Sequence, residues 1–150
     1  MLVAISQTLK SIIRADDFVV RWGGEEFLVI LNNTSPDYLD AFARKALHAV
    51  SALSIKISEG QTIQKTCSIG YAQFPFAGHA PASLSLEQTI MLSDQAMFIA
   101  KREGRDRAVR FHWKVGCPGS GRPEDLPAIL SAKSESMGDC VEVFRIKNGE

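Results

Sequence analysis

Apolar residues recur at helical spacing in two segments of the first third of this sequence. The first segment, residues 1–13, places its apolar side chains on one helical face and begins without a capping residue. The second follows Ser35-Pro36-Asp37, where a hydroxyl cap, a proline and an acid indicate a helix start. The first stripe comprises Leu2, Ile5, Leu9, Ile12 and Ile13, and the second comprises Leu39, Phe42, Ala43, Ala46, Leu47 and Val50.

A third helix is predicted after residue 85. Ser85 and Gln88 have the spacing of a capping box, and the apolar pattern continues to about Arg102. Gly104 is expected to end the helix, because glycine readily adopts the left-handed conformation of a C-terminal cap.

Four runs have the composition of β-strands. FVVRW (18–22) and FLVIL (27–31) flank a Gly-Gly turn and predict an antiparallel hairpin. TIQKTCSIGYAQFP (62–75) predicts one long strand that ends at a proline, and AVRFHW (108–113) predicts a last strand. This alternation of helices and strands predicts an α+β fold with an antiparallel sheet flanked by helices.

The pattern changes towards the C-terminus. Residues 76–84 are expected to form a loop, and residues 116–139 are rich in Gly, Pro, Ser and charge. A short strand is predicted at 140–146. The chain is therefore divided into a folded part, 1–114, and a poorly ordered tail, 115–150.

Composition narrows the class of protein. The 150 residues are 45% hydrophobic and carry 17 basic and 17 acidic side chains, so the formal net charge is zero. The chain therefore lacks the broad positive potential that binding to nucleic acid or an anionic membrane would need. No apolar run approaches the roughly 20 residues that span a bilayer. Three widely spaced cysteines favour neither a zinc site nor a disulfide framework, and we expect a cytoplasmic location. A longer parent protein could still be anchored in the inner membrane.

The predicted turn between the first two strands carries the candidate chemistry. Gly23 and Gly24 would leave room for a ligand against the backbone. The adjacent carboxylates of Glu25 and Glu26 could face a hard cation such as Mg²⁺, which bridges carboxylate and phosphate oxygens. The alternative is an acidic hairpin turn without chemistry, because acidic turns are common.

Five motifs in register resemble those of the GGDEF family of diguanylate cyclases. RWGGEEF has the form of the family's signature loop, and the RxxD, SIG, AD-x-AL-Y-x-AK and K-x-x-G-R motifs follow the family's order. These motifs lie at residues 21–27, 14–17, 66–70, 93–101 and 101–105, and the resemblance covers about residues 1–113. Phe98 replaces the family's tyrosine and Ser93 its alanine.

The resemblance implies a nucleotidyl-cyclase-like (ferredoxin-like) fold and the condensation of two GTP into cyclic di-GMP with release of pyrophosphate. It implies that Glu25 binds Mg²⁺ or Mn²⁺, and that Glu26 binds metal or accepts the 3′-hydroxyl proton. Gly23 and Gly24 would lie against the nucleotide. Two such domains would face each other in a homodimer, since each holds one GTP.

The resemblance also implies two sets of anion contacts. Lys101 and Arg105 would bind phosphates, and their spacing of four suggests one face at the end of the third helix. The alternative for this pair is a solvated helix end.

Arg14 and Asp17 would form an inhibitory cyclic di-GMP site, with Arg44 or Lys45 as a further basic contact. The alternative for Arg14 and Asp17 is an exposed ion pair worth about 0–1 kcal/mol.

A complete domain of this family also contains an N-terminal part with the central strand and further Asp and Asn residues, which are absent from this chain. We therefore expect unpaired strand edges, exposed apolar side chains and little or no cyclase activity from the chain alone. Two non-catalytic alternatives are a cyclic di-GMP receptor and a module that pairs with another GGDEF domain. The parent protein is expected to carry an upstream sensor or receiver domain.

Overall fold

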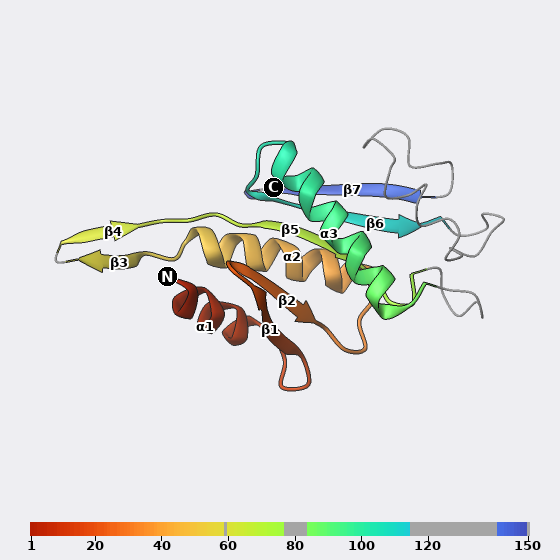
Figure 1. Ribbon diagram of the computed structural model, residues 1–150, viewed down its shortest axis with the longest axis horizontal. Coiled ribbons are helices and arrows are strands. Elements are labelled where there is room, and N and C mark those ends of the chain that lie inside the picture. The colour runs from red at the N-terminus through yellow and green to blue at the C-terminus, as the bar shows by residue number, and fades with distance from the viewer. Residues whose placement is uncertain (59, 77–83, 115–140, 150) are drawn as a thin grey trace. The chain divides into compact units, whose positions relative to one another are not determined.

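The computed structural model of this chain describes residues 1–58, 60–76, 84–114 and 141–149 (Figure 1). These residues form two compact units. The first contains Met1–Cys67 and the end of the chain, and the second contains Ser68–Lys147.

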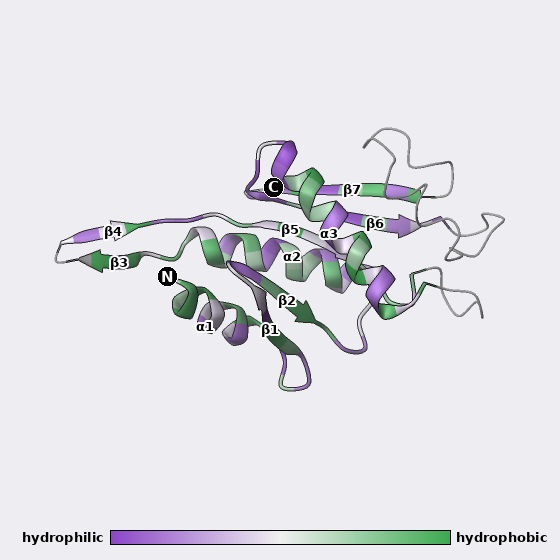
Figure 2. Ribbon diagram, viewed as in Figure 1, coloured by the Kyte–Doolittle hydropathy of each residue, from purple (hydrophilic) through white to green (hydrophobic). Residues whose placement is uncertain are grey.

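Two helices of the first unit confirm the predicted starts and apolar stripes. Helix α1 is Leu2–Ile12 and helix α2 is Pro36–Ser51, and the two helices contact each other. The Ser35 side chain accepts a hydrogen bond from the Tyr38 amide, as expected of an N-cap. Apolar and polar positions alternate along α2 in Figure 2. The buried residues of α2 are Ala43, Ala46, Leu47 and Val50.

The predicted hairpin is also present in the first unit. Strand β1 (Phe18–Gly23) pairs antiparallel with β2 (Glu26–Ile30), with Arg21 opposite Phe27. Successive side chains of a strand point to opposite faces, so every second residue lies on the same face. Three apolar side chains at such alternate positions of β1 are exposed. They are Phe18, Val20 and Trp22. The expected exposure of apolar side chains is therefore confirmed for this hairpin.

The prediction of one long strand over 62–75 is wrong. The segment instead contributes to two strands, β4 (Gln61–Ile63) and β5 (Ser68–Ala72). Strand β4 pairs with β3 (Ile55–Ser58), which the sequence pattern did not predict, whereas β5 pairs with β6 in the second unit. The two halves of the run pair with different strands, and residues 64–67 between them belong to no strand.

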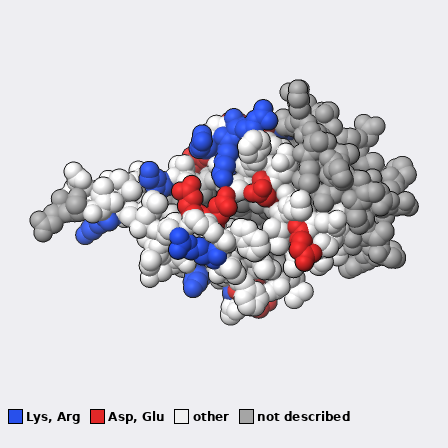
Figure 3. Space-filling model, in the orientation of Figure 1, with Lys and Arg blue, Asp and Glu red and all other residues white. Residues whose placement is uncertain are grey.

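In the part of the second unit that the structure describes, one helix covers a three-stranded sheet. Strand β5 runs parallel to β6 (Arg107–Trp113), and β6 pairs antiparallel with β7 (Val141–Lys147). Helix α3 (Leu86–Arg102) connects the parallel pair and begins with the predicted capping box. Figure 3 shows basic side chains gathered over the end of this helix. The core consists of Phe76, Leu84, Leu92, Ala96, Ile99, Ala100, Val109, Phe111 and Val141.

The sheets confirm the α+β class with one difference in direction. The sequence predicted antiparallel strands, whereas β5 and β6 are parallel because the helix between them returns the chain to the same end. The described strands form three sheets, with the orders β1–β2, β3–β4 and β5–β6–β7. Strand β7 lies where a short strand was predicted, at 140–146. Most of the predicted tail lies outside the described residues, and the division at residue 114 stays a prediction.

Gly70 explains why helix α3 can lie against strand β5. A Cβ atom added to Gly70 would be 1.9 Å from the Ser93 carbonyl oxygen and 2.1 Å from the Met97 amide nitrogen. Both atoms belong to the helix backbone, so no side-chain rotation could make room. The glycine of the SIG motif is therefore required for close packing of the helix on the sheet.

No helix among the described residues is both long enough and apolar enough to cross a membrane.

Candidate functional site

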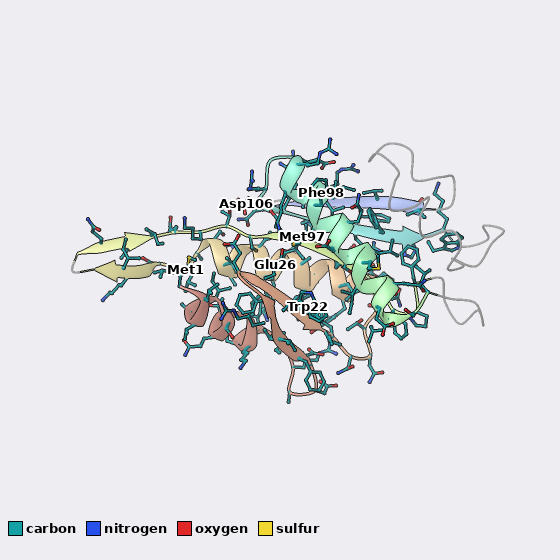
Figure 4. All side chains as sticks on the ribbon, viewed as in Figure 1. Met1, Trp22, Glu26, Met97, Phe98 and Asp106 are labelled. Carbon is teal, nitrogen blue, oxygen red and sulfur yellow. The ribbon has the colours of Figure 1, made fainter. Side chains whose placement is uncertain are left out.

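The candidate site is the tip of the β1–β2 hairpin. The strand register shifts between Arg21 and Gly23, which leaves Trp22 as an extra residue in a bulge. Trp22 and Glu26, both labelled in Figure 4, belong to this hairpin. Gly24 has a φ of 50°, a conformation that favours glycine. A Cβ at Gly23 or Gly24 would meet nothing within 4 Å, so the turn backbone is open to a ligand.

The side chain of Arg21 holds this turn in place. Its Nε and Nη2 donate hydrogen bonds of 3.0 and 2.8 Å to the carbonyl oxygen of Gly24. A charged guanidinium on one carbonyl oxygen restrains the backbone that presents the carboxylates. This role was not predicted from the sequence. Its only signal was an arginine immediately before the Trp-Gly-Gly turn.

Glu25 and Glu26 supply the only acidic side chains of the turn, and both are exposed. Among the residues that the structure describes, no group of three His, Cys, Asp or Glu side chains could hold a metal ion. Mg²⁺ commonly binds one or two carboxylates together with substrate phosphates and water. The two carboxylates therefore fit a magnesium ion that arrives with a nucleotide, rather than a closed structural metal site.

Asp17 is a structural anchor of the loop after α1. Its side chain is buried, and its two carboxylate oxygens accept 2.9 Å hydrogen bonds from the backbone amides of Arg14 and Asn32. These bonds tie the Arg14–Asp17 turn to the end of β2. The role of Asp17 as a guanine contact stays a prediction, and its visible role is to fix the backbone that carries Arg14.

Arg14 is exposed, and its guanidinium lies 4.0 Å from the centre of the Tyr38 ring. Stacking on an aromatic ring restrains a guanidinium without using its hydrogen-bond donors. Lys45 reaches the same end of α1, because its Nζ lies 3.5 Å from the carbonyl oxygen of Ile12. Arg44 is also exposed on α2. The structure thus brings Arg14, Asp17 and Lys45 to the loop that follows α1.

The prediction that Lys101 and Arg105 share one helical face is wrong. Helix α3 ends at Arg102, and the next residues leave the helix. Gly104, Arg105 and Asp106 have φ values of 113°, 61° and 50°, so the chain turns sharply at the glycine. The Arg105 amide still donates to the Ala100 carbonyl oxygen at 3.0 Å, which closes the helix end. Lys101 lies in the last helical turn, and Arg105 lies in the α3–β6 turn.

The predicted site residues are divided between the two units. Gly23, Gly24, Glu25 and Glu26 form one turn in the first unit, whereas Lys101 and Arg105 belong to the second. The assignment of all six to one nucleotide stays a prediction.

Comparisons with known proteins identify the family. The sequence model described as "Diguanylate cyclase, GGDEF domain" matches residues 1–107. The chain is 34% identical to diguanylate cyclase DosC of Escherichia coli (strain K12) over 107 residues, which are 71% of this chain and 22% of that protein. It is also 34% identical to diguanylate cyclase A of Treponema denticola over 71% of this chain and 27% of that protein.

Solved structures of GGDEF domains have the same fold. The GGDEF domain of YfiN (TpbB) from Pseudomonas aeruginosa has a TM-score of 0.58 and 33% identity, over 69% of this chain and 62% of that one. Diguanylate cyclase SiaD of the same organism, solved with its activator SiaC, has a TM-score of 0.62 and 28% identity, over 73% of this chain and 39% of that one.

The fold is the nucleotidyl-cyclase-like α+β fold of GGDEF domains. The chain belongs to the GGDEF family of diguanylate cyclases, as the match over residues 1–107 shows. It spans about a quarter of the length of the curated relatives named above.

Proposed function

We propose that this chain carries the magnesium and nucleotide-phosphate site of a diguanylate cyclase, and that the Gly23–Glu26 turn is that site. The observation that supports the proposal is the combination of two exposed carboxylates with an open glycine backbone on a turn held by Arg21. A turn without chemistry would explain Gly24 by its positive φ, but it would not require two adjacent acids.

Each part of the turn has a defined task in this proposal. Glu25 would hold the cation, and Glu26 would help to bind it or accept the proton of the attacking 3′-hydroxyl. The bound Mg²⁺ would neutralise phosphate charge that develops during transfer. Gly23 and Gly24 admit the nucleotide to the backbone, and Arg21 keeps the carboxylates in a fixed position. A second copy would supply the other GTP, because each site holds a single nucleotide.

GTP titration in a calorimeter, with and without Mg²⁺, tests this site. We compare the unmodified chain with Glu25→Gln and Glu26→Gln, and use Glu142→Gln as a control because Glu142 is an exposed acid on β7. The proposal expects Mg²⁺-dependent binding that both turn variants weaken and the control preserves. GTP affinity that is equal in all four proteins would contradict it.

Turnover is measured in the same samples by mass spectrometry of the nucleotide pool. Little or no cyclic di-GMP is expected from the isolated chain. If the unmodified chain makes robust amounts of product and Glu26→Gln makes none, the site is catalytically sufficient and the expected inactivity is wrong.

A second candidate function is the binding of cyclic di-GMP at the loop after α1. The stacked, exposed guanidinium of Arg14 favours it, since the donors of that side chain remain available to a phosphate or a guanine edge. Arg14→Ala should abolish cyclic di-GMP binding and leave GTP binding at the hairpin intact. Loss of both would instead indicate that Arg14 maintains the fold.

The partners that would control this site are also part of the proposal. SiaD was solved with an activator protein, and the curated relatives are several times longer than the matched segment. We therefore propose that a sensor or receiver domain of a parent protein controls the pairing of two such sites. A concentration-dependent change in mass that neither nucleotide alters would favour a pairing module instead.

A further inference from the structure

The last described strand is joined to the end of α3 by a bidentate ion pair. Arg145 on β7 donates from Nε to both carboxylate oxygens of Glu103 at 3.0 Å, and its Nη2 lies 2.9 Å from Oε1. Two parallel bonds between a guanidinium and a carboxylate fix direction as well as distance. Glu103 is the C-terminal cap residue of α3. The pair therefore fixes the point at which the chain leaves the helix.

The turn that follows Glu103 is held in an uncommon conformation. Arg105 and Asp106 both have positive φ values, which non-glycine residues rarely adopt and which cost free energy. Such a conformation persists only where surrounding contacts impose it. Arg107 supplies one such contact, because its Nε donates to the Arg105 carbonyl oxygen at 3.0 Å.

Arg107 also links the turn to Glu103. Its Nη1 lies 3.8 Å from Oε2 of Glu103, so Glu103 lies between two arginines, one from β6 and one from β7. The backbone of β7 reinforces this arrangement. It pairs with β6 along its whole length, with Arg145 opposite Val109 and Lys147 opposite Arg107.

Strand β7 lies beyond residue 107, where the match to the family ends. The Arg145–Glu103 pair therefore joins a residue outside the matched segment to one inside it.

We propose that Arg145 and Glu103 are positioning residues that fix the Gly104–Arg105 turn, and thereby hold Arg105 for the phosphates of a nucleotide. The second part rests on the proposed GTP binding and on the prediction, implied by the family resemblance, that Arg105 contacts phosphate. Arg145 itself touches no substrate in this proposal. It acts through Glu103 on the backbone conformation of the turn.

The test uses the full chain with Arg145→Met, Glu103→Gln and the double variant. Arg145→Met keeps an unbranched side chain and removes the guanidinium. Arg102→Met is the matched control, because it removes an exposed cation from the same helix end, and the contact found for Arg102 is with Phe98. Two quantities are measured: hydrogen exchange of the Arg105 amide, and affinity for GTP compared with affinity for guanosine.

We expect both single variants to speed exchange of the Arg105 amide and to weaken GTP binding about threefold, a change typical of a partly exposed ion pair. Guanosine affinity should not change, because the turn acts on the phosphates alone. The double variant should resemble the worse single variant, since the two side chains act as one unit. A general loss of folding would instead speed exchange throughout the chain and weaken both ligands.

Two results would overturn the proposal. One is an unchanged exchange rate at Arg105 in Arg145→Met, and the other is an equal effect of Arg102→Met. A chain that binds no GTP would refute the proposed function, and the exchange rates would then still decide whether Arg145 fixes the turn.

Discussion

Replacing Gly70 by alanine should destabilise the second unit. The added Cβ would lie 1.9 Å from the Ser93 carbonyl oxygen, 2.1 Å from the Met97 amide nitrogen and 2.8 Å from the Met97 Cα. Ordinary carbon contacts begin at about 3.5 Å, so helix α3 would have to move by about 1.5 Å. Overpacking typically costs about 1–3 kcal/mol. The contacts are with helix backbone, so we expect the upper end of that range.

The assay is thermal and urea unfolding of Gly70→Ala beside a matched glycine variant. Gly23→Ala is the control, because a Cβ at Gly23 would meet nothing within 4 Å. A loss of about 3 kcal/mol should lower the Tm by about 10 °C, whereas Gly23→Ala should leave it nearly unchanged. The reasoning is refuted if Gly70→Ala unfolds within about 2 °C of the unmodified chain.

Three further predictions concern the candidate sites. Arg21→Lys keeps the charge but leaves only one group that can reach the Gly24 carbonyl oxygen. GTP affinity measured by calorimetry should therefore fall several-fold while the Tm stays constant. A constant affinity would argue against a role for the two Arg21 hydrogen bonds. Tyr38→Leu removes the ring beneath Arg14 and should weaken cyclic di-GMP binding by about two- to fivefold; unchanged binding would mean that stacking is unimportant. Asp17→Ala leaves two backbone amides without their acceptor and should cost about 2–3 kcal/mol in urea unfolding; a neutral effect would remove its structural role.

Local chemistry in the sequence was sufficient to predict the helix starts. Ser35 and Ser85 act on amides within three residues of themselves, so their capping roles are visible in the sequence. The β1–β2 hairpin was predictable for the same reason, since two glycines lie between two apolar runs. Gly104 likewise marks the end of α3 by its own conformational freedom.

Features that depend on distant partners were not predictable. The apolar run over 62–75 looked continuous, and only the pairing of β4 with β3 and of β5 with β6 divides it. The parallel direction of β5 depends on helix α3, which follows it. Arg145 and Glu103 are 42 residues apart, so no local pattern indicates their pairing.

The residue types of the candidate site could be predicted from the sequence, but their contacts could not. The acids and glycines of the turn were identified from the sequence. The hydrogen bonds from Arg21 to the Gly24 carbonyl oxygen depend instead on the conformation of the Arg21 side chain. Asp17 was predicted as a ligand contact, and only the structure reveals the two amides that its carboxylate accepts. Arg105 was placed on a helical face from its spacing to Lys101, although it follows Gly104, the residue that was expected to end the helix.

The central claim is that the Gly23–Glu26 turn binds GTP through Mg²⁺. The most direct test is calorimetric GTP titration of the chain and of a Glu25→Gln/Glu26→Gln double variant, each with Mg²⁺ and with a chelator. The claim predicts that the unmodified chain binds GTP with Mg²⁺ present and not with the chelator. It also predicts that the double variant binds at least about tenfold more weakly, which corresponds to about 1.4 kcal/mol of binding free energy. Equal GTP affinity for both proteins, or affinity that the chelator leaves unchanged, would contradict it.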